Sequence, residues 1–94
     1  MKRKIQIRSS FKRDLKRIKK AGLDMNKLFT VVEKLANDEI LEENYRDHKL
    51  TGNYTGCREC HIEPDWLLIY ENVDDNLILI LNRTGSHSDL FWKK

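Results

Sequence analysis

The N-terminal part of the chain has a pattern of apolar and polar residues that predicts one short strand and two helices. Residues 4–8 alternate apolar and polar side chains, as a half-buried strand does. Apolar residues then recur three or four positions apart through residues 11–18, with Ser10 as the expected N-cap and Gly22 as the expected end. A second helix follows Asp24, its expected cap, and its predicted apolar face consists of Met25, Leu28, Phe29, Val32, Leu35 and Ala36. We expect the two helices to form a hairpin with both apolar faces in the core.

The remainder of the chain predicts three strands. After a polar, irregular stretch at 37–56, strand candidates occupy residues 58–62, 66–71 and 77–83, and residues 72–76 supply a turn. The order β-α-α-β-β-β predicts an antiparallel sheet, a meander packed on the helical hairpin, and therefore an α+β fold. At 94 residues the chain is expected to be a single domain, 1–94.

Composition and charge narrow the class of protein. Hydrophobic residues at 39% and charged residues at 35% are typical of a soluble, folded chain. No apolar run reaches the length of a membrane span, and the basic N-terminus lacks the apolar centre of a secretory signal, so we expect a cytoplasmic protein. More than half of the 18 Lys and Arg residues fall within residues 2–20. This basic segment either steers the protein towards phosphates or is a solvated helix face.

The stretch GCRECHIEPDW, residues 56–66, has the Cys-x-x-Cys-His spacing of c-type haem attachment and half the spacing of a zinc site. A strand over residues 58–62 would send alternate side chains to opposite faces, so Cys57 and Cys60 should point apart. A zinc knuckle needs two thiolates that converge, and the sequence offers no second ligand pair. We therefore expect no metal and no cofactor, with Cys60 in the core and Cys57 at a strand edge.

The same alternation leaves Glu59 and His61 side by side on the face opposite the core. One such pair is usually ordinary surface, but His48 and His87 also lie in polar stretches flanked by turns. A meander can bring strand ends together, so three histidines, two carboxylates and Arg83 are candidates for one edge of the sheet. Such a set can cleave RNA without metal, because a base removes the 2′-OH proton, an acid protonates the leaving 5′-oxygen and a cation holds the phosphate.

Longer motifs give a family resemblance. The segment YRDHKLTGNYTGCRECHIEPDWLLIY at 45–70, together with LNRTGSHSDLF at 81–91, resembles the YafQ branch of the RelE/ParE superfamily of bacterial type II toxins. The likeness spans essentially the whole chain and includes DMNKL at 24–28. It implies a RelE-like fold and a ribosome-dependent endoribonuclease that contacts 16S rRNA and cuts mRNA in the A site until a cognate antitoxin neutralises it. The cut would give a 2′,3′-cyclic phosphate or 3′-phosphate and a 5′-hydroxyl, without metal.

The resemblance also assigns functional positions. The expected catalytic residues are His48, Glu59, His61, Asp65, Arg83 and His87, and the expected substrate-binding residues are Phe91, Arg58 and Lys49. Arg83 would stabilise the negative charge of the phosphorane-like transition state, and Phe91 would stack on a splayed base. Glu59 stands where some relatives carry Asp. Trp92, beyond the usual end of the motif, either stacks on RNA or packs against the protein.

Acid and base roles follow from the same resemblance and from side-chain chemistry. We expect His87, placed after a flexible turn at residues 84–85, to be the general acid, because an imidazole titrates near physiological pH. Either His48 or Asp65 is expected to be the general base. His61 would position the scissile phosphate or tune its neighbours.

Two other classes of function are alternatives. A ParE-like toxin would inhibit DNA gyrase by binding, without nuclease chemistry. A non-catalytic RNA-binding module would use the basic first helix alone. The histidines argue against the gyrase alternative, because a protein that only binds has no need of three histidines in polar contexts beside two carboxylates. The RNA-binding module predicts that histidine substitutions leave function intact.

Overall fold

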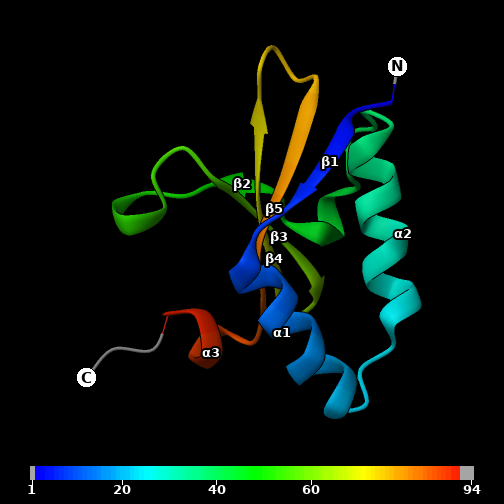
Figure 1. Ribbon diagram of the computed structural model, residues 1–94, viewed down its shortest axis with the longest axis vertical. Helices are drawn as coiled ribbons and strands as arrows, with labels where there is room; N and C mark the ends of the chain where they lie inside the picture. Colours follow the sequence, from blue (N-terminus) through cyan, green and yellow to red (C-terminus); the bar gives the residue numbers. More distant parts are fainter. Residues whose placement is uncertain (1, 92–94) are drawn as a thin grey trace.

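The computed structural model describes residues 2–91, so Trp92 lies outside the described residues (Figure 1). The predicted order of a strand, two helices and a three-stranded meander is confirmed, and the polar stretch at 37–56 adds a short strand and two 3-10 turns. In chain order the elements are β1 (Lys4–Ile7), α1 (Ser9–Lys20), α2 (Met25–Ala36), η1 (Glu43–Tyr45), β2 (His48–Lys49), η2 (Gly52–Tyr54), β3 (Arg58–Glu63), β4 (Trp66–Val73), β5 (Ile78–Gly85) and α3 (His87–Phe91). None of the helices within residues 2–91 combines the length and the apolar character needed to cross a membrane.

The strands form one sheet in the order β1-β5-β4-β3-β2. As predicted, β3, β4 and β5 are an antiparallel meander, and β2 extends it with antiparallel pairing to β3. β1 instead pairs in parallel with the first half of β5, so the sheet is mixed and not wholly antiparallel as expected. Alternation along a strand predicts which side chains are buried, but it carries no information about the direction of a partner far away in sequence.

Helices α1 and α2 both pack on one face of the sheet (Figure 1). Asp24 caps α2 as predicted, accepting a hydrogen bond from the Asn26 amide at 3.0 Å. The predicted apolar face of α2 is partly wrong, because Val31 is buried whereas Phe29 is 55% exposed. The main core includes Phe11 and Ile18 from α1, Leu28, Val31, Leu35 and Ala36 from α2, and Cys60, Ile62, Leu68, Tyr70, Leu79 and Leu81 from the sheet.

β1 covers only the first half of β5, and α1 covers the open edge of the second half. Ser10 lies inside α1 and is not its N-cap as expected; its hydroxyl donates to the Asn82 carbonyl at 2.7 Å. One turn further, Asp14 accepts the Thr84 amide hydrogen at 3.1 Å, and Arg17 donates to the Thr84 carbonyl at 3.3 Å. Side chains of α1 thus satisfy backbone groups that an uncovered strand edge leaves unpaired.

The opposite face of the sheet carries a smaller apolar cluster and the short C-terminal helix. Leu67 and Ile69 of β4 pack against Leu90 of α3. The expected flexible turn at residues 84–85 is wrong, since both residues form the buried end of β5. Helix α3 therefore begins almost directly at a core strand, which fixes where its first residue, His87, lies.

Candidate active site

The three histidines come together on the face of the sheet that α1 and α2 leave open. Strand alternation places Glu59 and His61 on this face, as predicted, and the pairing of β2 with β3 sets His48 opposite Glu59. Helix α3 begins with His87. The ring centroids of His48 and His61 are 6.3 Å apart, and those of His61 and His87 are 5.6 Å apart. His61 therefore lies between the other two.

Glu59 is buried and only 4% exposed. It is therefore not the surface residue that an adjacent Glu and His on a strand would usually include. Its Oε1 lies 3.3 Å from His48 Nε2 and 3.5 Å from His61 Nε2. The Nδ1 atoms face backbone carbonyls, that of Arg46 at 2.6 Å from His48 and that of Pro64 at 3.2 Å from His61. A carbonyl only accepts, so each Nδ1–H must donate. With Nδ1–H donating to a carbonyl, each ring turns its other nitrogen, Nε2, towards Oε1 of Glu59.

Asp65 orients His87. Its Oδ1 accepts two hydrogen bonds from His87, one from the backbone N–H at 3.0 Å and one from Nδ1–H at 2.7 Å. These bonds, the backbone one above all, hold the pKa of Asp65 below its ordinary value of 3.8, so the carboxylate is ionised at neutral pH. Both side chains are more than half exposed, at 54% and 69%. With Nδ1 engaged, His87 presents Nε2 to a substrate.

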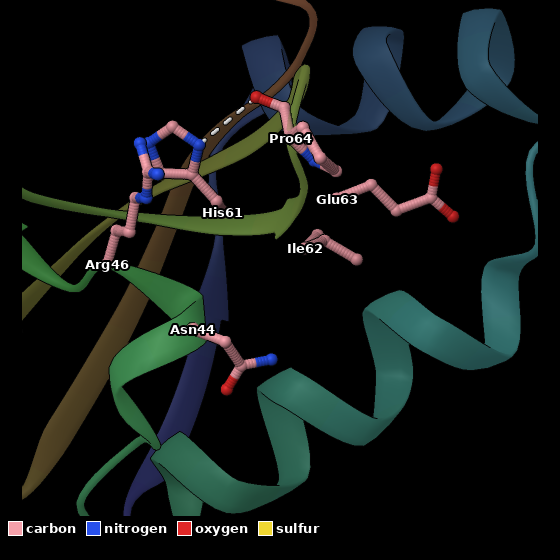
Figure 2. Close-up of a pocket in the computed structure, with 6 residues that line it drawn as sticks. All are labelled: Asn44, Arg46, His61, Ile62, Glu63 and Pro64. Atoms are coloured by element: carbon pink, nitrogen blue, oxygen red, sulfur yellow. Dashed lines mark hydrogen bonds between the residues drawn. The ribbon is translucent and has the colours of Figure 1, made fainter.

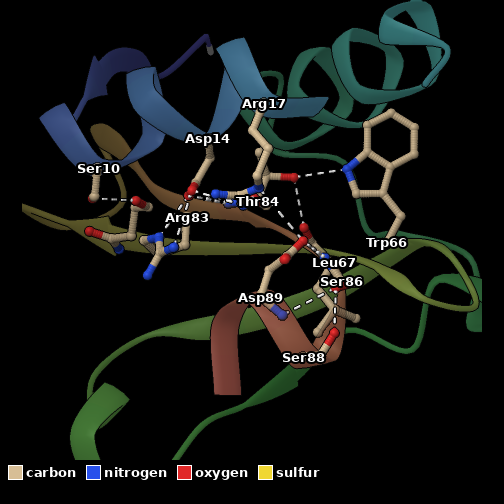
Figure 3. A network of polar contacts seen from close by, with 11 residues as sticks. Ser10, Asp14, Arg17, Trp66, Leu67, Arg83, Thr84, Ser86, Ser88 and Asp89 are labelled. Atoms are coloured by element: carbon tan, nitrogen blue, oxygen red, sulfur yellow. Dashed lines mark hydrogen bonds and ion pairs between the residues drawn. The ribbon is translucent and has the colours of Figure 1, made fainter. Parts of the chain in front are cut away.

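A carboxylate that the sequence did not single out holds Arg83 in place. Asp14 is 1% exposed and accepts from Arg83 Nε at 2.6 Å and from Nη2 at 3.1 Å (Figure 3). The hydrogen bonds to Asp14 raise the pKa of Arg83 above its usual value. Within residues 2–91, Arg83 Nη1 has no carboxylate partner, so that edge of the guanidinium can meet an anion beside the Tyr54 side chain. The sequence feature that could have indicated this role is that Asp14 is the one acidic residue on the apolar stripe of α1, between Phe11 and Ile18.

Phe91 packs against the ring of Tyr54, a residue that the sequence did not indicate as part of the site. The Phe91 ring centroid lies 6.5 Å from that of His87 and 5.6 Å from that of Tyr54, which it meets edge to face. After Asp14, Tyr54 also contributes to the raised pKa of Arg83, which places its hydroxyl near the guanidinium. An aromatic residue in a polar turn gave no sequence signal of this role.

The other two expected substrate contacts lie elsewhere. Lys49 and Arg58 are register partners next to the pair of His48 and Glu59, so alternation turns them away from the histidines. Arg58 Nε donates to Asp47 Oδ1 at 3.2 Å, and the same oxygen accepts the Tyr70 hydroxyl at 2.6 Å. Arg58 thus helps to anchor the loop that carries His48, and the structure does not bring it or Lys49 to the cluster.

A shallow pocket of about 370 Å³ adjoins His61 at the end of β3. Figure 2 shows Asn44 and Arg46 on its η1 side and the residues of β3 across from them. Arg46 has a φ of +49°, a left-handed conformation that is uncommon for a residue with a side chain. Its carbonyl is the one that receives His48 Nδ1–H. Within residues 2–91 the Arg46 side chain makes no ion pair, and it lines this pocket beside His61.

The cysteines point apart, as predicted. Cys60 is fully buried in the core beneath the helices, whereas Cys57 packs beside the smaller cluster on the other face. Burial raises the pKa of both thiols, which favours the protonated form over the thiolate that a metal requires. This geometry does not fit a zinc knuckle or a covalently attached haem.

A different group of side chains has the spacing of a metal site. Glu59, His61 and His87 each offer one ligand atom, and the three atoms lie within 4.8 Å of one another. Two ligands of one ion, each about 2.1 Å from it, are at most about 4.2 Å apart. A small movement of these side chains would therefore let an ion bind.

The chain is similar to known proteins over nearly its whole length. Residues 3–92 match the family model described as bacterial toxin of type II toxin-antitoxin system, YafQ. The mRNA interferase toxin YafQ of Escherichia coli K12 is 40% identical over 90 residues, which cover 95% of this chain and 96% of that protein.

Two solved structures are similar over nearly their full length. The Escherichia coli DinJ-YafQ toxin-antitoxin complex contains a chain with 39% identity and a TM-score of 0.87, covering 97% of this chain and 99% of that one. A metal-bound toxin from Helicobacter pylori has 42% identity and a TM-score of 0.87, covering 97% and 100%. The family match and the shared fold agree with the motifs in the sequence, and the chain therefore belongs to the YafQ family of bacterial toxins of type II toxin–antitoxin systems.

Proposed function

We propose that this chain is an mRNA interferase, an endoribonuclease that cuts mRNA in the ribosomal A site and is neutralised by a cognate antitoxin. Its enzyme class is that of the Escherichia coli relative, which is named an mRNA interferase toxin. The neutralisation is inferred from the complex of a similar chain with the antitoxin DinJ. The proposal rests mainly on the row of His48, His61 and His87. The buried Glu59 contacts the first two rings, and the exposed Asp65 contacts the third.

His87 is the general acid that protonates the leaving 5′-oxygen. The ionised Asp65, 2.7 Å from its Nδ1, stabilises the imidazolium that an acid must be before it gives up its proton. The ring is half exposed and presents Nε2, so a message can reach it. A positioned general acid contributes typically about 10²–10⁴-fold to a rate.

His48 is the general base that removes the 2′-OH proton. Its Nδ1–H is fixed on the Arg46 carbonyl, which directs Nε2 towards Glu59 and the open face. Asp65, the other candidate, already accepts two hydrogen bonds from His87. Glu59 stabilises the imidazolium that forms when His48 accepts the proton, which gives the buried carboxylate an electrostatic role and not a direct one.

The groups between and beside these two histidines hold the phosphate and the base. His61 lies between the proposed base and acid, where it can donate to a non-bridging oxygen of the scissile phosphate. Arg83 offers its Nη1 edge to the charge that develops in the transition state. Phe91 and Tyr54 provide ring surfaces for a splayed base, a contact worth about 1–3 kcal/mol in single-strand binding.

The reaction proposed for this chain uses only proton transfers between side chains and RNA, and a metal would interfere with it. A relative from Helicobacter pylori is a metal-bound toxin. In this chain, the residues spaced to bind an ion are Glu59, His61 and His87. An ion bound there would occupy the lone pairs of His61 and His87, so we propose that metal binding inhibits cleavage.

The chemistry predicts a strict requirement for one hydroxyl group of the message. Programmed ribosomes should be mixed with the protein and an mRNA carrying a single 2′-deoxynucleotide immediately 5′ to the scissile bond. Because the attacking oxygen is missing, we expect no cleavage at that bond, whereas the all-ribose message should yield a 2′,3′-cyclic phosphate or 3′-phosphate and a 5′-hydroxyl. The matched control places the deoxynucleotide one codon downstream and should be cut normally. Cleavage of the first deoxy message, or a 5′-phosphate product, would contradict the proposal.

A further inference from the structure

We propose that Asp14 of α1 is a positioning residue for RNA cleavage, which sets the direction of Arg83 and, through Arg17, ties the segment that carries His87 to the same helix. The inference rests on the proposed function, because it takes Arg83 as the group that meets the phosphate. None of the sequence motifs includes Asp14, which lies 69 positions from Arg83 along the chain.

The contact between Asp14 and Arg83 has the geometry of a fixed fork. Two donors of one guanidinium edge, Nε and Nη2, reach the two carboxylate oxygens at 2.6 and 3.1 Å. Oδ2 also accepts the Thr84 amide at 3.1 Å, so the carboxylate is itself held by the backbone of β5. Two hydrogen bonds along one edge of a planar guanidinium restrict its rotation. They thereby set the direction in which its other edge points.

Asp14 has a structural role as the acceptor of the Thr84 amide, but that role does not require a carboxylate, because an asparagine oxygen can accept the same hydrogen bond. Asp14 occupies the apolar stripe of α1 between Phe11 and Ile18, and it is 1% exposed. Burying an ion pair carries a desolvation penalty, and apolar residues of similar volume often serve a core as well or better. Neither an apolar residue nor an asparagine offers two acceptor oxygens to Nε and Nη2 of Arg83, so only a carboxylate gives the guanidinium the fixed direction that a catalytic cation needs.

A second contact extends the same network to α3. Arg17 Nη2 lies 3.0 Å from Asp14 Oδ1, and its Nε lies 3.7 Å from Asp89 Oδ2 (Figure 3). Asp89 in turn accepts the backbone N–H immediately before His87 at 3.1 Å. Arg17 passes so close to Gly85 that a Cβ added there would lie 2.8 Å from Nη2. One helix thus holds both the proposed cation and the short helix that carries the proposed acid.

A double-mutant cycle tests this inference. Asp14→Asn, Arg83→Ala and the double variant are compared in single-turnover cleavage of A-site mRNA at saturating enzyme, with ribosome affinity and thermal midpoint measured separately. We expect Asp14→Asn to slow cleavage, on the order of 10²-fold for a misplaced group, with little change in affinity. In the Arg83→Ala background the same substitution should slow cleavage far less, by only as much as the contact through Arg17 to α3 contributes. Glu33→Gln is the matched control, because it also replaces a helical acid in an ion pair, with Lys2, far from the site.

Independent effects of the two substitutions that multiply would overturn the role of Asp14 and leave that of Arg83 intact. Cleavage by Arg83→Ala at the wild-type rate would overturn the proposed use of Arg83, and the role of Asp14 with it. If Asp14→Asn does not fold, the Arg83→Ala protein is tested with added guanidinium and with added methylammonium. A carboxylate set for a fork predicts that guanidinium restores cleavage and methylammonium does not; equal rescue by both, or rescue by neither, would overturn the inference.

Discussion

At the scale of single residues, period-two alternation along β3 correctly predicted which side chains share a face of the sheet. It placed Glu59 beside His61 and separated Cys57 from Cys60, because a strand has only two faces and the register of the motif was clear. It did not predict the burial of Glu59, which depends on side chains that other elements contribute. Nor did it predict the role of Asp14, since the partner of a buried charge is not visible in the local sequence.

The spacing of Glu59, His61 and His87 predicts that a divalent ion binds and inhibits. Titration with Cu²⁺ or Zn²⁺ should show about one ion per chain, and affinity should fall as the pH is lowered, because protons compete with the ion for the histidine nitrogens. Added ion should stop mRNA cleavage, and EDTA should restore it.

The matched control for metal binding is another histidine of the same row. His61→Gln should weaken binding strongly, whereas His48→Gln, which removes a ring outside the three-ligand group, should leave binding of the ion largely unchanged. Equal affinity of His61→Gln and the wild type would show that the ion binds elsewhere.

At the scale of elements, the pattern of apolar residues predicted where the helices and strands lie. It did not predict which elements pair with one another. β1 pairs in parallel with β5, and α1 rather than another strand covers the rest of that edge. Neither fact has a local signature, because both depend on segments about 70 residues apart. The buried side of α1 is fully engaged by the core and by β5, which leaves its basic side for a partner.

The exposed lysines of α1 are expected to dock the protein on ribosomal RNA. Replacing Lys12, Lys16, Lys19 and Lys20 with Gln should weaken ribosome binding and flatten its dependence on salt, because fewer counterions are released. A slope change of about 0.7–0.9 per lost phosphate contact is expected when the logarithm of affinity is plotted against the logarithm of salt.

The control uses two lysines of α2 that already have partners. Lys27 pairs with Glu63 at 2.7 Å and Lys34 with Glu42 at 2.9 Å, so replacing both with Gln should change the slope little. An unchanged slope in the α1 variant would return its lysines to the role of a solvated helix face.

At the scale of the whole molecule, the site exists only because β2, β3 and α3 meet at one place on the sheet. The predicted meander was a reason to expect strand ends to meet. No pattern in the sequence predicted that Leu90 anchors α3 or that residues 48–49 form strand β2. The family motifs supplied the residues in order, and the folded chain gathers most of them. Arg58 and Lys49 are the exceptions, since strand alternation turns them to the other face.

Single-turnover cleavage of A-site mRNA by His87→Ala, at saturating enzyme, tests whether His87 donates a proton to the leaving group. The side chain is 54% exposed, so its loss should open no core cavity and should move the thermal midpoint little. For a variant shown to be folded and bound to the ribosome, we expect a rate about 10²–10⁴-fold below that of the wild type. Cleavage by this variant at the wild-type rate would contradict the general-acid assignment, and a wild-type protein that arrests growth without cutting any message would contradict the nuclease itself in favour of a toxin that acts by binding gyrase.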